Sequence, residues 1–292
     1  MDPRDALAQL GGVAQSADLL RLTSRKRLRT ALERGDVERL ARGRYRLPDA
    51  DRALARAARA GGVVSHLSAA VVHGWEVAHP PPLPWVTVPR KAKVTDRRAV
   101  NLVYGDLTEE RVVTGCTRTV VDCARRLPFP EALAVADSAL RRGDVDGVRL
   151  VRAADEVRGK GAASARRVAR YADARAANPF ESVLRALALE AGLDVEPQGA
   201  VTAGGRTLHP DVLDRDHRLA LEADSWAWHG ARDAFARDCW RYTVLTLAGW
   251  RVLRFTHHQV MRQPDWVVAC LRTAAAGVPV IGSLDGEEKM SA

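Results

Sequence analysis

The stretch from Leu208 to Gly230, "LHPDVLDRDHRLALEADSWAWHG", constrains the fold most, because it places acidic residues inside two short apolar segments. Successive side chains of a β-strand point to opposite faces of the sheet, so residues two apart share a face. In "LALEAD", Ala220, Glu222 and Asp224 should therefore face one way, and the leucines the other way. The stretch predicts a hairpin that carries carboxylates on one face.

The pairing of the two strands decides which carboxylates meet. A tight turn at Asp216-His217 pairs Leu213 with Ala220, Val212 with Leu221, and Asp211 with Glu222. This register gathers the carboxylates of Asp211, Glu222 and Asp224, whereas a slip of one residue would move Asp211 to the opposite face. Like charges at ~4 Å repel by about 1 kcal/mol per pair even in bulk water. The cluster therefore predicts a bound cation.

Each of these acidic residues also has a structural explanation. Asn178 to Glu181 resembles a capping box, with Asn178 as the cap, a proline at the first helical position and Glu181 at the third. Asp211 could pair with an arginine such as Arg251 or Arg254. Glu222 lies between apolar neighbours, so its charge needs a partner in any fold. At the level of the sequence both explanations stay open.

Length and composition narrow the class of protein. A chain of 292 residues is long enough for two or three compact domains. Its four cysteines have no zinc-like spacing, so we expect buried free thiols. We also expect a cytoplasmic protein with no membrane partner, because no signal peptide and no apolar run of about 18 residues is visible. The net charge of +9 favours an anionic partner such as nucleic acid, although an arginine-rich composition from a GC-rich genome would also produce it.

Residues 5 to 47 read as three short helices followed by a hairpin. Ser16 should begin the second helix, Thr23 or Ser24 the third, and Gly35 should end it. After that, "VERLARGRYRLP" alternates around Ala41 to Arg44 as a two-stranded wing would. We therefore expect a winged helix-turn-helix over residues 1–50.

The basic residues of this region are concentrated in the third helix and the wing. Leu28, Ala31 and Leu32 have the spacing of a core face, which leaves the cations pointing outward. A recognition helix in the major groove, with wing arginines on the backbone, requires that arrangement. The residues predicted to bind DNA are Arg25, Lys26, Arg27, Arg29, Arg42 and Arg44. The alternative is a solvated basic face on a protein-interaction module.

The remainder of the chain reads as two further domains, which makes the fold class α+β multidomain. Residues 51–172 should form a mixed α/β domain with a helix in "GGVVSHLSAAVVHGW", two strands, a helix pair broken at Pro128 and Pro130, and a helical linker at its end. His66 and His73 are seven residues apart, which favours packed histidines over a metal pair. Residues 173–292 should contain a helix over 179–191, the hairpin, a helix over 231–248, the strand "WRVLRFT" and a helix over 264–276.

Four segments of the last domain resemble the very-short-patch-repair-like branch of the PD-(D/E)xK nucleases. They are "NPFESVLRALALEAGL", "HPDVLDRDHRLALEAD", "WH" and "RDCWRYTVLTLAGWRVLRFT". The resemblance implies a restriction-endonuclease-like α/β fold, with Glu181 as the helix carboxylate and Asp211 and Glu222 as metal ligands. Asp224 would be a further acidic ligand, where many relatives have lysine. His229 matches a histidine of that branch and would replace the lysine in activating water.

The first two thirds resemble the AbiEi-type antitoxins of abortive-infection systems, through the winged helix, "VVSHLSAAVVHGW" and "TRTVVDCARRL". Together the resemblances imply a Mg²⁺- or Mn²⁺-dependent DNA endonuclease, in phage defence or DNA repair. The alternative is a transcriptional regulator or antitoxin whose nuclease-like domain does not cut, with a cognate toxin or a second copy of the chain as partner. A nuclease acting on RNA is a third reading.

Overall fold

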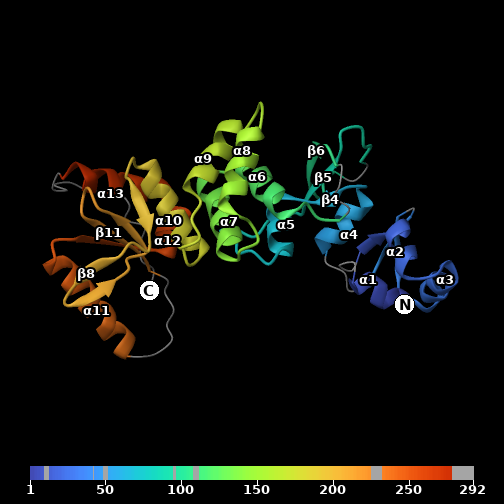
Figure 1. Cartoon of the computed structure of the whole chain (residues 1–292), viewed down its shortest axis with the longest axis horizontal. Helices are drawn as coiled ribbons and strands as arrows, with labels where there is room; N and C mark the ends of the chain where they lie inside the picture. The colour runs from blue at the N-terminus through green and yellow to red at the C-terminus, as the bar shows by residue number, and fades with distance from the viewer. Residues whose placement is uncertain are drawn as a thin grey trace. The chain divides into compact units, whose positions relative to one another are not determined.

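The structure, a computed structural model, describes residues 1–9, 13–41, 43–48, 52–94, 97–107, 112–224 and 232–277 (Figure 1). The chain divides into two compact units. Unit one comprises Met1–Arg126 and Val148–Ala165, and unit two comprises Leu127–Gly147 and Arg166–Ala292. In the described ranges, no helix combines the length and apolarity needed to cross a membrane.

The N-terminal segment of unit one contains three helices and a small sheet. Its elements are α1 (Pro3–Gln9), β1 (Val13–Gln15), α2 (Ser16–Leu22), α3 (Arg25–Arg34), β2 (Glu38–Ala41) and β3 (Arg44–Arg46). The three strands pair antiparallel in the order β1-β3-β2, so the predicted hairpin is present. Ser24 caps α3 and Gly35 ends it at a φ of 77°, a conformation that glycine adopts without strain.

The second segment of unit one is built around another three-stranded sheet. Its elements are α4 (Arg52–Arg59), β4 (Val63–Val64), α5 (His66–Val72), β5 (Trp85–Pro89), β6 (Asn101–Gly105) and α6 (Cys116–Arg126). Strand β5 lies in the middle, antiparallel to β4 and parallel to β6. Its alternate residues Val86 and Val88 are fully buried against Leu54 of α4.

The two histidines of this segment are packed, as the sequence predicts. His66 stacks on Trp85 with 4.8 Å between ring centroids and contacts the hydroxyl of Ser65 at 2.9 Å. Burial lowers the pKa of His66 to about 3, so the ring is neutral. His73 instead contacts the carbonyl oxygen of Thr114 at 2.8 Å.

Further helices follow in the chain. They are α7 (Phe129–Arg141), α8 (Gly147–Glu156) and α9 (Ala162–Tyr171). The expected break is confirmed at Pro128, between α6 and α7, whereas Pro130 lies in the first turn of α7.

All four cysteines are free, but only Cys123 is buried, and Cys239 is exposed on its helix. The expectation of buried thiols is therefore wrong for Cys239.

Unit two holds a four-stranded sheet and a separate hairpin. Its strands are β7 (Val195–Pro197), β8 (Val201–Ala203), β9 (Arg206–Leu208), β10 (Val212–Asp214), β11 (Leu219–Asp224) and β12 (Arg251–Thr256). The sheet order is β12-β11-β10-β7, with β11 parallel to β12 and the other neighbours antiparallel. Strands β8 and β9 form the hairpin.

Helices pack against this sheet and complete the core of unit two (Figure 1). They are α10 (Pro179–Glu190), α11 (Arg232–Leu247), α12 (His257–Arg262) and α13 (Pro264–Ala276). Leu245 of α11 packs with Leu213 and Ala220, so α11 covers the sheet face on which Ala220 lies. Glu222 and Asp224 share that face because they follow Ala220 at intervals of two.

Candidate active site

The register of the central hairpin brings the candidate carboxylates together at one end of the sheet. Val212 pairs with Leu221 and Leu213 with Ala220, so the predicted register is confirmed. Asp211 immediately precedes β10, and its Oδ2 atom accepts a hydrogen bond of 2.8 Å from the backbone N–H of Ala223. This bond fixes the Asp211 carboxylate beside the neighbouring strand, at the residue that lies between Glu222 and Asp224 in sequence.

Gln198 joins Asp211 to Glu181 of α10. Its Nε2 atom donates to Glu181 Oε2 at 3.0 Å and lies 3.4 Å from Asp211 Oδ1. The backbone N–H of Gln198 donates to the carbonyl oxygen of Asp211 at 3.1 Å. Gln198 has a φ of 53°, in the left-handed region that costs a non-glycine residue free energy. Sequence reasoning missed Gln198, since a lone glutamine in a connecting segment has no distinguishing pattern.

Glu181 lies in the first turn of α10 and close to the acidic cluster. Asn178 is the cap of α10, because its side-chain oxygen accepts from the backbone N–H of Glu181 at 3.0 Å. The Glu181 carboxylate accepts from the backbone N–H of Ala177 at 2.9 Å and from Asn178 Nδ2 at 2.8 Å. Burial raises the pKa of Glu181, and the nearby Asp211 charge adds to the rise. The structure therefore agrees with both explanations of Glu181: its carboxylate accepts hydrogen bonds at the start of α10, and it lies near Asp211.

Glu222 is the most confined of these acids, with its side chain only 3% exposed. Arg241 of α11 places Nη2 2.9 Å from Glu222 Oε1. The contact lacks hydrogen-bond geometry, so Oε1 is a buried oxygen with no hydrogen bond among the described residues. The same Nη2 atom donates to the carbonyl oxygen of His209 at 2.6 Å. Burial, followed by repulsion from Asp211, raises the pKa of Glu222 to about 8.

Asp224 lies at the end of β11 and is paired with Arg254 of the parallel neighbour β12. Arg254 Nε donates to Asp224 Oδ2 at 2.6 Å, and both side chains are partly exposed. The guanidinium of Arg254 also stacks 4.3 Å from the ring centroid of Tyr242. Arg254 therefore pairs with Asp224, and the alternative that it pairs with Asp211 is wrong.

Arg251, the other arginine considered as a partner of Asp211, does not reach it either. It donates to the carbonyl oxygens of Ala274 and His217, at 2.7 and 3.0 Å. Burial raises the pKa of Asp211, and its two donors are the backbone of Ala223 and the side chain of Gln198. No arginine is bonded to Asp211 in the described part of the chain, which leaves its carboxylate held only by neutral donors.

The metal assignment of Asp211, Glu222 and Asp224 stays a prediction. In the ranges that the structure covers, no group of three or more histidine, cysteine, aspartate or glutamate side chains is placed to hold a metal ion. Two of the three carboxylates face arginines instead. His229 lies in residues 225–231, outside the described residues, so its assigned role stays a prediction too.

The predicted DNA-binding residues of α3 lie on the exposed side of that helix. Leu28 and Ala31 are buried, and the cations around them are exposed: Arg25, Lys26, Arg27 and Arg29. Arg27 Nη1 lies 3.3 Å from the carbonyl oxygen of Met1. Arg42 and the side chain of Arg44 fall outside the described residues.

Comparison with known proteins bears on the C-terminal site. Residues 180–274 match the family REase_MTES_1575, so the C-terminal part of the chain holds a restriction-endonuclease-like domain. Two curated relatives are the uncharacterised proteins MT2308 and Rv2248 of Mycobacterium tuberculosis, strains CDC 1551 and H37Rv. Each is 33% identical over 162 residues, which cover 54% of this chain and 60% of the relative. The match thus spans less than two thirds of the relatives' length.

The crystal structure of the RV2827C protein from Mycobacterium tuberculosis is a more distant likeness. The two chains are 17% identical and superpose with a TM-score of 0.32, over 70% of this chain and 88% of the other.

Proposed function

We propose that this protein is a metal-dependent endonuclease that hydrolyses phosphodiester bonds in DNA. The observation that carries the proposal is the pairing of β10 with β11, which sets Asp211 beside Glu222 within a restriction-endonuclease-like domain. Asp211, Glu222 and Asp224 are the proposed metal ligands, with Glu181 supporting Asp211 through Gln198. His229 is the proposed activator of water.

The chemistry of these side chains suits a hard divalent cation, although the described ones are not placed as a group of three metal ligands. Carboxylate oxygens are the ligands that Mg²⁺ and Mn²⁺ prefer. Glu222 offers a buried oxygen without a hydrogen bond among the described residues, next to a second carboxylate that repels its charge. A bound divalent cation would supply a water of lowered pKa and stabilise negative charge on the scissile phosphate.

The roles of the chain's own groups follow from their surroundings. Gln198 and the backbone of Ala223 orient Asp211 without neutralising it. Arg241 and Arg254 place a guanidinium beside Glu222 and beside Asp224. Both arginines stand beside the acidic pair, where a guanidinium also suits a phosphate oxygen.

DNA engagement is the proposed task of the N-terminal segment. Its three helices and antiparallel sheet have the element order of a winged helix-turn-helix, and α3 exposes Arg25, Lys26, Arg27 and Arg29. In such a module the basic helix lies in the major groove and contacts phosphates at its edges. Arg42 and Arg44 would add wing contacts to the backbone.

Incubation of supercoiled plasmid with the full chain tests the proposal. With Mg²⁺ or Mn²⁺ the wild type should nick or linearise the plasmid, and EDTA should abolish this activity. Asp211→Asn and Glu222→Gln should each lose at least about two orders of magnitude in rate, because a metal ligand is removed. Asp216→Asn is the matched control, since Asp216 is exposed in the turn of the same hairpin.

A second candidate function is that of a transcriptional regulator or antitoxin whose nuclease-like domain does not cut. The close approach of Arg241 to Glu222 and of Arg254 to Asp224 favours it, because two of the three acids have a cation beside them without a metal. Its partner would be a cognate toxin or a second copy of this chain. Cleavage that is absent on duplex, single-stranded and mismatched DNA, with DNA binding retained, would select this function.

A further inference from the structure

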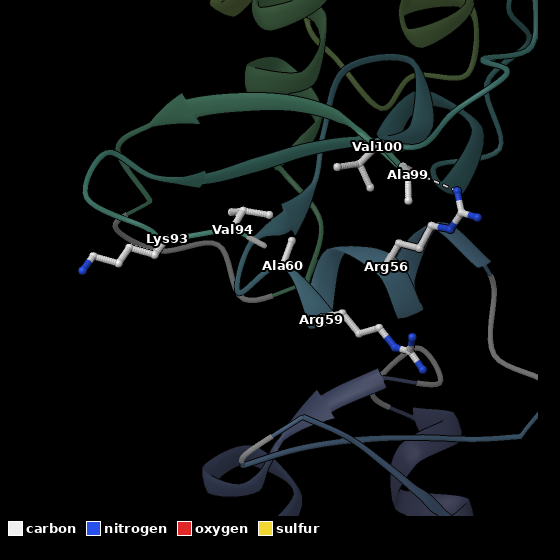
Figure 2. A pocket seen from close by; sticks show the side chains of 7 residues that line it. All are labelled: Arg56, Arg59, Ala60, Lys93, Val94, Ala99 and Val100. Atoms are coloured by element: carbon white, nitrogen blue, oxygen red, sulfur yellow. Dashed lines mark hydrogen bonds between the residues drawn. The ribbon is translucent and has the colours of Figure 1, made fainter. Parts of the chain in front are cut away.

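Unit one contains a basic cavity far along the chain from the acidic site. It has a volume of about 360 Å³ and lies between α4 and the connection from β5 to β6. Three cations line it, Arg56, Arg59 and Lys93, together with four alanine and valine residues (Figure 2). We infer that this cavity binds the phosphates of a nucleic-acid backbone. The choice of nucleic acid as the source of these phosphates rests on the proposed function.

The described residues that line the cavity do not neutralise its charge. Among its described lining residues there is no acidic side chain. Neither Arg59 nor Lys93 has an ion pair or side-chain hydrogen bond to any residue that the structure describes. By contrast, Arg90 at the start of the same connection is paired with Asp106 at 2.9 Å. Among the described residues, the cavity therefore offers two cations without an acidic partner, which could meet an anion.

The remaining walls favour binding over simple solvation of the charges. Val100 is buried and Ala60, Val94 and Ala99 are partly buried, so one side of the cavity is apolar. Ion pairs are stronger beside an apolar wall than in open water, because the effective dielectric constant is lower. A solvated basic face, the ordinary alternative, needs no such wall.

The positions of the three cations suit an extended anion. Arg56 is held by a hydrogen bond of 2.6 Å from Nη1 to the carbonyl oxygen of Ala99. Figure 2 shows the Lys93 side chain at the opposite end of the cavity, pointing away from Arg56, with Arg59 below them. Head groups that diverge in this way can meet successive phosphates of a strand better than they can enclose one small ion.

The location of the cavity agrees with a role in DNA binding. Helix α4, which supplies both arginines, also contacts β1 and β2 of the N-terminal segment. The connection that supplies Lys93 reads "RKAKVTDRR" over residues 90–98, with five basic residues and one acidic residue. Arg97 and Arg98 in it are exposed. Basic residues in two separate elements thus border the cavity.

Fluorescence anisotropy of the full chain with a short labelled DNA duplex tests this inference, in EDTA and over a series of KCl concentrations. The variant is Arg59→Ala/Lys93→Ala. The matched control is Arg152→Ala/Lys160→Ala, which removes the same charge from positions of the same unit that lie outside the cavity. The first pair should lower affinity about tenfold or more and reduce the log–log salt slope by roughly one to two, while the control keeps both values.

A second arm separates the source of the phosphate. Inorganic pyrophosphate is added in a thermal melt of the same proteins. If wild type and the Arg59→Ala/Lys93→Ala variant bind the duplex with equal affinity and slope, the cavity is not a backbone site, and the proposed function still stands. If wild type binds no DNA but pyrophosphate stabilises it and not the variant, the proposed function fails and the phosphate site is kept for small ligands. If the variant and wild type behave alike in both arms, the inference is overturned.

Discussion

At the scale of single residues, Glu222 links the stability of the protein to pH. Its carboxyl is buried beside Asp211, and its pKa rises from an ordinary value of 4.5 to about 8. Between these values the folded protein holds a proton that the unfolded chain releases. The free energy of unfolding contributed by this group is therefore fully present below about pH 4.5 and is lost as the pH rises through 8.

Measured without divalent cations, wild type should lose stability between about pH 5 and pH 8.5 more steeply than Glu222→Gln. The Glu222 contribution is at most about 5 kcal/mol over this window, because one pKa unit corresponds to about 1.4 kcal/mol. Urea titrations at a series of pH values give the slopes, and Asp216→Asn should follow wild type. Parallel slopes for wild type and Glu222→Gln would show that Arg241 keeps Glu222 ionised in the folded protein.

Gln198 is the second residue whose contribution to the free energy of unfolding can be measured by itself. Gln198→Asn should lower the free energy of unfolding by about 1–3 kcal/mol, since the shorter amide cannot reach both Glu181 and Asp211. Asparagine tolerates the left-handed backbone found at this position, so the variant removes the bonds and keeps the conformation. Gln198→Ala should be less stable still, because it adds backbone strain. Equal stability of wild type and Gln198→Asn would mean that the bridge contributes nothing.

At the scale of elements, local signals in the sequence predicted the register of the hairpin and the ends of helices. The contacts between elements distant in sequence were not predicted. The register of β10 with β11 follows from a short turn and the alternation of apolar residues, and the start of α10 follows from the Asn178-Pro179 cap. The β8–β9 hairpin and α12 were not predicted, since neither has a long periodic pattern. The contacts of Arg241 and Gln198 with the acids depend on which elements meet in space. Periodicity within one element carries no such information.

The packing of α7 on α10 is a further contact that the sequence did not indicate. Asp137 of α7 accepts two hydrogen bonds from Arg185 Nη2, at 2.9 and 2.8 Å, and both side chains are buried. Asp137 also accepts from the backbone N–H of Asp173 at 2.8 Å. The domain boundary expected near residue 173 stays a prediction, while these bonds join α7 to unit two.

Removing one partner of this ion pair should destabilise the protein more than replacing both partners by apolar residues. Asp137→Leu or Arg185→Met leaves a buried charge without its partner, which should cost about 3–5 kcal/mol of unfolding free energy. The double variant Asp137→Leu/Arg185→Met removes both charges and should be clearly more stable than either single variant. Urea denaturation of the four proteins forms the cycle. A double variant as unstable as the sum of the singles would show that packing, and not charge, dominates.

At the scale of the whole molecule, the proposed function assigns DNA binding to exposed basic residues of α3 and cleavage to the carboxylates of the restriction-endonuclease-like domain. The chain has a net charge of +9, and α3 exposes four successive or nearly successive cations. Each cation that contacts a phosphate releases a counterion when DNA binds, so affinity should fall steeply with salt. The steepness of that fall measures how many phosphates the protein neutralises.

Replacing Arg25 and Arg29 by alanine in the full chain should weaken DNA binding at every salt concentration. The log–log slope should fall by roughly one for each phosphate that the variant no longer neutralises, because about 0.9 counterions are released per neutralised phosphate of duplex DNA. Anisotropy titrations in EDTA measure both quantities without cleavage, with Arg152→Ala/Lys160→Ala as the charge-matched control. Isotherms for the Arg25→Ala/Arg29→Ala protein that coincide with wild type across the salt series would place the DNA site elsewhere. Combined with the Arg59→Ala/Lys93→Ala variant, the reductions in slope should add, since the two sets of cations lie on separate helices and connections and share no partner among the described residues.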